Sequence, residues 1–119
     1  MGASTPEGKV KRKVIAVLNE RKIWYFCPVT SGYSRSGVPD IICIVNGLFV
    51  GIECKATPAH KLTPLQEKCK QEVMQSGGKW FLVCDVTSLN VFTSWLDHWL
   101  ARNLYWIPKE KPWENTNVR

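Results

Sequence analysis

The sequence lacks any apolar run close to the roughly 20 residues that a membrane-spanning helix needs. Its longest apolar runs are far shorter, as at 41–45. The first residues contain no apolar signal-peptide segment, and Gly2 with Pro6 fits a myristoylation pattern poorly. Internal repeats and low-complexity stretches are also missing. We therefore expect a cytoplasmic protein that has no membrane partner.

Metal-binding patterns of cysteine and histidine are scarce as well. The two histidines, His60 and His98, are far apart, and no Cys-x-x-Cys occurs, which argues against a zinc site. The cysteines number five, which is odd, and all of them lie in apolar segments. We expect free thiols that fill the core in a reducing compartment, not a disulfide framework.

The sequence does contain enough apolar residues for a core, together with an excess of positive charge. Its 119 residues are about the length of one domain, and 45% apolar residues with 11% aromatics can bury a core. The net charge of +6 and the pI near 9.2 favour polyanionic partners, because Lys and Arg neutralise phosphates. Charge alone does not separate DNA from RNA or an acidic membrane, and a basic surface that serves solubility is an equal alternative.

The pattern of turn signals and apolar spacing predicts alternating helices and strands. A capping box, Ser4-x-x-Glu7, with Pro6 in the first turn opens a helix with apolar residues at helical spacing. Further elements are expected as a strand at 23–27, a polar loop at 30–37, a hairpin within 39–56, a helix capped by Thr63 and ending at Gly77-Gly78, an internal strand at 80–84, a helix from Thr87 or Ser88, and an extended remainder at 103–119.

These elements give the order α-β-β-β-α-β-α, an α/β fold in which helices cover a mixed sheet. The helical crossover between the third and fourth strands makes those two strands parallel. We expect one domain over residues 1–119, with a core at about 4–101 and a C-terminal extension at 102–119. Tyr105, Trp106 and Trp113 in that extension follow no periodic pattern and are candidates for a subunit interface.

The dipeptide Asn46-Gly47 signals a two-residue type I′ turn and thereby sets the register of the hairpin. Counting outward from this turn places Asp40 directly opposite Glu53. Opposed residues have Cβ atoms about 4.5–5.5 Å apart on one face, so two carboxylates come together there, and Lys55 shares that face. The other hairpin residues are apolar on both faces, which predicts a central, covered hairpin.

Opposed carboxylates repel each other unless a cation lies between them. Asp40 and Glu53, with a backbone carbonyl and waters, would suit Mg²⁺, which needs only one or two protein carboxylates. Lys55 could hold an attacking water or offset charge that develops in the transition state. The alternative is a strand end without a ligand. Pro-Asp and Glu-x-Lys are each too common to exclude that alternative, so the register carries the argument for a site.

The motifs Gly-x-Pro-Asp at 37–40 and Glu-x-Lys at 53–55, separated by a hairpin, resemble the PD-(D/E)-x-K nuclease superfamily. More narrowly, the chain resembles the stand-alone VRR-NUC domains, many of them phage-encoded and related to Holliday-junction resolvases. The similarity extends to about residue 95 through Leu-Thr-Pro-Leu-Gln at 62–66 and Gly-Gly at 77–78. It implies a restriction-endonuclease-like αβββαβ core and a Mg²⁺-dependent endonuclease, with Mn²⁺ able to substitute, that leaves a 5′-phosphate and a 3′-hydroxyl.

The resemblance also implies roles for individual residues. Asp40 and Glu53 would bind the metal together with the main-chain carbonyl of Cys54, whose side chain would fill the core. Lys55 would position or activate the water. A protein of this type, if phage-encoded, would act in the cytoplasm of the host.

Glu7 and Gln66 each have two interpretations. Glu7 lies on the inward stripe of the first helix, and the resemblance favours an active-site role for it over the alternative of a capping-box residue. Gln66 matches a helix-borne Gln of the family that could steer the substrate or a metal-bound water. A capping partner for Thr63 is an equal alternative for Gln66.

The leading hypothesis is a structure-selective endonuclease that acts as a homodimer on branched DNA such as a four-way junction, because one active site cuts one strand. A sequence-specific or general nicking nuclease is the alternative with the same chemistry. A non-catalytic nucleic-acid-binding module is the alternative from another class. Candidate DNA contacts, which ordinary surface polarity explains nearly as well, are Lys9, Arg12, Tyr33, Arg35 and Lys61.

Overall fold

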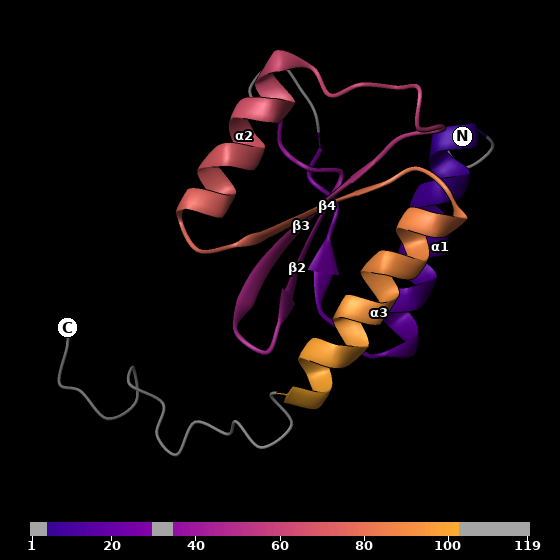
Figure 1. The fold of residues 1–119 in the computed structure, drawn as a ribbon, viewed down its shortest axis with the longest axis vertical. Helices are drawn as coiled ribbons and strands as arrows, with labels where there is room; N and C mark the ends of the chain where they lie inside the picture. The colour runs from indigo at the N-terminus through magenta and orange to yellow at the C-terminus, as the bar shows by residue number, and fades with distance from the viewer. Residues whose placement is uncertain (1–4, 30–34, 103–119) are drawn as a thin grey trace, which may run out of the picture.

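The structure, a computed structural model, describes residues 5–29 and 35–102. Within them, helices lie on both sides of a mixed four-stranded sheet (Figure 1). α1 (Pro6–Glu20) and α3 (Val86–Arg102) cover one face, and α2 (Pro64–Gln75) lies on the other. The guanidinium of Arg21, just after α1, donates to both carboxylate oxygens of Asp97 in α3, at 2.6 and 3.0 Å. This ion pair ties the two helices together.

The sheet has the spatial order β1-β2-β3-β4. β2 pairs antiparallel with β1 and with β3, and β3 pairs parallel with β4, as the predicted helical crossover requires. The prediction of an internal last strand is wrong, because β4 stands at an edge of the described sheet and most of its residues are only half-buried. The strands are β1 (Tyr25–Phe26), β2 (Ile41–Val45), β3 (Leu48–Cys54) and β4 (Lys79–Val83).

The hairpin of β2 and β3 has the predicted turn and register. Asn46 and Gly47 both have positive φ, 48° and 85°, as a type I′ turn requires. The paired residues run without a slip from Val45 opposite Leu48 to Ile41 opposite Ile52. Asp40 and Glu53 are therefore the next positions along the two strands.

The core lies between the sheet and the pair of helices α1 and α3. Alternate residues of β2 and β3 are fully buried there, among them Ile41 and Ile52. On the opposite face Ile44 and Phe49 remain 40% and 36% exposed. The prediction that the hairpin is covered on both faces is therefore wrong, because α2 packs mainly on β4. The helix residues that complete the core are Val14, Leu18, Phe92 and Leu96.

α1 does not begin with the predicted cap, and α3 begins one residue before Thr87, close to the predicted start near Thr87 or Ser88. The N-cap of α1 is Thr5, whose Oγ1 accepts a hydrogen bond from Gly8 N at 2.9 Å, so the predicted Ser4 capping box is wrong. Glu7 is then the second residue of the helix and not the third, where a capping-box acid stands. α3 begins at Val86 because the carboxylate of Asp85 accepts from Ser88 N at 2.7 Å.

The cysteines behave as predicted, since all five are free thiols. Burial raises the pKa of Cys43 to about 12 and raises that of Cys54 as well. Over the described ranges, no helix has the length and apolar character needed to span a bilayer. Tyr105, Trp106 and Trp113, predicted to contribute to a subunit interface, lie outside the described residues.

Candidate active site

Three charged residues gather at the end of the hairpin that is remote from its turn. Asp40 Oδ2 accepts a hydrogen bond from Cys54 N at 2.8 Å, which fixes the carboxylate against the end of β3. Lys55 Nζ lies 3.6 Å from Glu53 Oε2. The negative charge of Asp40 also acts on Glu53. The structure thus brings Asp40, Glu53 and Lys55 together, as the register predicts.

Glu53 carries its charge in a buried environment. It is 3% exposed and is the one buried polar or charged residue in the described part of the chain. Burial is the main cause that raises its pKa to about 7, and the charges of Asp40 and Glu7 raise it further, while Lys55 lowers it. Near neutral pH the carboxyl group of Glu53 is therefore partly protonated unless a further cation is present.

Gln66 is the predicted capping partner of Thr63, and its side chain also contacts Glu53. Its side-chain Oε1 accepts from Thr63 N at 2.9 Å, and its backbone N–H donates to Thr63 Oγ1 at 3.2 Å, which completes the capping box of α2. Its Nε2 donates to Glu53 Oε2 at 2.9 Å. The start of α2 is thereby joined to the acidic site, and the capping box sets the orientation of the amide.

Glu7 stands across from Asp40 on the first turns of α1. Together with Gly8, Lys11 and Arg12 it lines a hollow of about 380 Å³ that Asp40 also borders. Its influence on the site is electrostatic, because its charge raises the pKa of Glu53. The structure thus places Glu7 at the site and removes the capping-box alternative.

The acids of the site supply carboxylate oxygens, which are the ligands that a hard divalent cation prefers. No group of three or more His, Cys, Asp or Glu side chains within residues 5–29 and 35–102 is arranged to hold a metal ion, so the site is not a closed protein cage. Mg²⁺ needs only one or two carboxylates and keeps several waters. Asp40 and Glu53 use Oδ2 and Oε2 for the contacts described above, and their Oδ1 and Oε1 are the candidate ligand atoms. The residue types present are those that such an ion uses, and a metal here with the carbonyl of Cys54 among its ligands stays a prediction.

Gly51, near the site, was not singled out from the sequence, whereas Lys11 was a candidate for a phosphate contact, with a solvated helix face as an equal alternative. A Cβ at Gly51 would lie 2.7 Å from Pro39 Cγ, so glycine lets the residue before Asp40 pack closely on β3. Lys11 borders the same hollow as Asp40. The sequence signal for Lys11 is its place four residues after Glu7, which puts both on one helix face.

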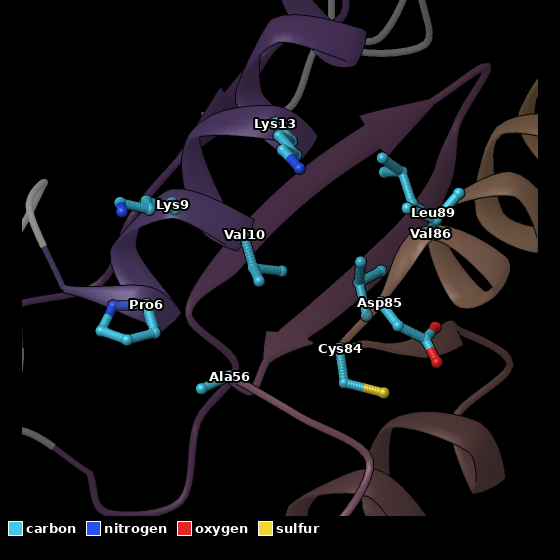
Figure 2. A pocket seen from close by; sticks show the side chains of 10 residues that line it. Pro6, Lys9, Val10, Lys13, Ala56, Cys84, Asp85, Val86 and Leu89 are labelled. Carbon is cyan, nitrogen blue, oxygen red and sulfur yellow. The ribbon is translucent and has the colours of Figure 1, made fainter.

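The predicted DNA contacts are dispersed over the surface. Lys9 borders a second hollow, of about 350 Å³, between α1 and α3, where it lies with Lys13 across from Asp85 (Figure 2). Arg12 lies at the hollow that contains Asp40. Arg35 forms an ion pair with Glu72 of α2. Of the other two, Lys61 is exposed before α2, and Tyr33 lies outside the described residues.

Comparison with known proteins establishes the fold. No family model matches the sequence, and no curated protein is significantly similar to it. A solved structure described as "VRR_NUC domain" is similar, with a TM-score of 0.62 and 22% sequence identity, and the match covers 86% of this chain and 100% of that chain. The chain therefore has the fold of a VRR-NUC domain, a restriction-endonuclease-like α/β architecture, which confirms the predicted fold and the resemblance at the level of structure.

Proposed function

We propose that this protein is a metal-dependent DNA endonuclease that hydrolyses phosphodiester bonds. The observation that carries the proposal is a buried carboxylate, Glu53, held beside Asp40 and Lys55 at the end of a hairpin. Burying a charge is costly, and strongly perturbed carboxylates concentrate at functional sites. The VRR-NUC fold supports a nuclease over other reactions that use a carboxylate pair.

Each residue has a defined task in this proposal. Asp40 and Glu53 hold Mg²⁺ or Mn²⁺, which when bound polarises a phosphoryl oxygen and makes water a better nucleophile. Lys55 positions the attacking water and offsets the negative charge that builds on the phosphate. Gln66 keeps Glu53 in its orientation through the hydrogen bond to Oε2.

The substrate is proposed to be DNA, with a preference for branched forms such as a four-way junction. The net charge of +6 suits a polyanion, and Lys11 and Arg12 border the hollow at Asp40. Because one site cuts one strand, symmetric cutting of a junction requires a homodimer. The products carry a 5′-phosphate and a 3′-hydroxyl, and the reaction takes place in the cytoplasm.

The test compares labelled four-way junction, flap and plain duplex DNA, each incubated with protein in Mg²⁺, in Mn²⁺ and in excess chelator. Wild type should cut in either metal and stop with chelator. Lys55→Ala should not cut. Lys68→Ala, which changes an exposed lysine of α2 away from the acids, serves as the matched control and should cut normally.

Two results would contradict parts of the proposal separately. Equal cutting by Lys55→Ala and wild type would show that a contaminating nuclease or another site is responsible, and the assignment of endonuclease activity to the site at Asp40, Glu53 and Lys55 would fail. A monomer in sedimentation that only nicks DNA would remove the junction-resolving homodimer and leave the nuclease.

A further inference from the structure

Two large aromatic side chains are exposed side by side at the edge strand β1, Trp24 directly before the strand and Phe26 within it. Trp24 is 60% exposed and Phe26 is 45% exposed. Their ring centroids are 5.6 Å apart, with a tilt of 53° between the planes. Tyr25, between them in sequence, packs against the core. The strand therefore turns one ring inward and presents the other two on the opposite face of the sheet.

The register of the sheet places this aromatic pair on the same face as the acidic site. Phe26 is opposite Ile42 and Ile42 is opposite Gly51, and Glu53 lies two residues after Gly51, so the Glu53 side chain points to the same face. With strands about 4.8 Å apart and a rise of about 3.3 Å per residue, Phe26 and Asp40 are separated by roughly 8 Å along the sheet. Trp24 follows in the direction away from Asp40, because its carbonyl accepts from Ile44 N at 3.2 Å.

The surface around these rings is apolar, and two cationic side chains of α1 border the hollow at Asp40. Ile44, on the same face, is 40% exposed, and α2 contacts chiefly β4, at the other edge of the sheet. Lys11 and Arg12 of α1 line the hollow of about 380 Å³ that Asp40 also lines. In the described part of the chain neither of these two cations takes part in an ion pair. Cations suit a phosphate backbone and flat aromatic rings suit bases, so the two surfaces fit different parts of one nucleic acid strand.

We propose that Trp24 and Phe26 form a stacking surface for unpaired bases of a DNA strand whose backbone passes Asp40. This inference rests on the proposed function and names its substrate class, which is DNA with an unpaired segment next to the cleaved bond. In a continuous duplex the bases stack on each other and expose only their edges in the grooves. Only a strand with unstacked bases can therefore use both rings. Because stacking does not depend on base identity, the surface selects for structure and not for sequence.

The first experiment measures binding without cleavage. Fluorescence anisotropy in excess chelator compares a labelled oligo-dT with a duplex of equal length for wild type, Trp24→Ala, Phe26→Ala and the double variant. Each single variant should bind oligo-dT on the order of tenfold more weakly, and the double variant more weakly still. Duplex affinity should change by less than about twofold, since backbone contacts are intact.

The matched control is Val91→Ala, which removes an exposed apolar residue, 57% exposed, from α3 on the other face of the sheet. It should bind both DNAs as wild type does. Equal losses on oligo-dT and duplex, or unchanged binding of oligo-dT by the double variant, would overturn the proposal. Thermal melts of all variants ensure that only folded protein is compared, and exposed positions are expected to tolerate alanine.

A second measurement separates this inference from the nuclease proposal. In Mg²⁺, the ratio of cutting rates for a flapped substrate over a plain duplex should fall about tenfold in Trp24→Ala, while duplex nicking stays the same. If wild type cuts no DNA but the aromatic variants still lose oligo-dT binding, the stacking surface stands and the nuclease fails. If wild type cuts and this ratio is unchanged, the stacking surface alone is overturned.

The competing occupant of this face is another protein surface, including a second copy of the chain. Sedimentation velocity of wild type and the double variant distinguishes the two. A loss of assembly in the double variant, with oligo-dT binding unchanged, would show that the rings serve a protein interface and would overturn the proposal.

Discussion

The two faces of the sheet differ in what their residues contribute. On the face under α1 and α3, alternate residues of β2 and β3 are apolar and fully buried. On the face that α2 covers only in part, β3 carries Glu53, with Asp40 just before β2, and Ile44 and Phe49 stay partly exposed. One pair of strands thus supplies the core on one side and the candidate active site on the other.

This difference shows how a small domain can contain a buried carboxylate that lowers its stability. A buried carboxylate with a raised pKa opposes folding at neutral pH, and the covered face must offset that cost. Because successive residues in a strand point to opposite faces, neighbouring residues of β3 can serve different purposes. Ile52 packs in the core, and Glu53 belongs to the candidate active site. We therefore expect substitutions on the covered face to change stability and those on the open face to change activity.

The largest expected effect is on catalysis. Asp40→Asn removes one of the two charges that would hold the metal, while its amide oxygen can still accept from Cys54 N. Cleavage should fall about a thousandfold, because a bound metal contributes several kcal/mol to transition-state stabilisation. The measurement is kcat/KM on labelled junction DNA, with Glu67→Gln in α2 as control. A melting temperature that falls together with activity would instead indicate a structural role for Asp40.

On the covered face, Phe92→Ala should have the largest effect on stability. Phe92 is fully buried and packs edge-on against Phe81, with ring centroids 5.1 Å apart. The cavity should lower the free energy of unfolding by about 3–5 kcal/mol, as measured by urea denaturation. Val91→Ala next to it should cost less than about 0.5 kcal/mol. A similar loss for both variants would contradict the assignment of the core to this face.

Glu53→Gln should abolish cleavage and yet stabilise the metal-free protein at neutral pH. The folded-state pKa of about 7 lies above the ordinary 4.5, so the folded state of wild type binds the proton more tightly. Its stability should fall as the pH rises from about 4.5 to 7, by on the order of 2–3 kcal/mol. The variant lacks this loss. The difference in the free energy of unfolding between Glu53→Gln and wild type should therefore be absent below pH 4.5 and reach its full size above pH 7.

The measurement is the free energy of unfolding in chelator at pH 4, 6 and 8, by urea titration. Mg²⁺ should stabilise wild type but not Glu53→Gln at pH 8, because a ligand stabilises only the state that binds it. Parallel pH profiles for the two proteins would show that Glu53 is not the group whose proton affinity changes on folding.

The smallest expected effects distinguish the two roles of Gln66, which caps α2 and donates a hydrogen bond to Glu53. Thr63→Ala removes the capping box and should cost about 1 kcal/mol of stability with cleavage unchanged. Gln66→Ala should cost a similar amount and also lower kcat several-fold, because the hydrogen bond to Glu53 is lost. If both variants have the same kcat, the contact between Gln66 and Glu53 is structural only.

The sequence predicted those features that depend on short-range geometry. Asn46-Gly47 favours a turn with two positive φ angles, and the two-residue period of strands then carries the register outward to Asp40 and Glu53. The Thr63 capping box was predicted for the same reason, since it needs only residues within one turn of helix. The exact cap of α1 was not, because Ser4 and Thr5 are chemically similar caps and the choice between them depends on how the helix packs.

The amino-acid sequence by itself thus determined the order of elements, the hairpin register and the pairing of two acids beside Lys55, because local backbone preferences and side-chain alternation decide all of them. Only the tertiary structure decided which face is covered, because that depends on where α2 packs. It also placed Gln66 and Glu7 at Glu53, and exposed Trp24 and Phe26 on the same face. Burial and the pKa of Glu53 belong to this second group, since desolvation arises from residues far apart in the chain.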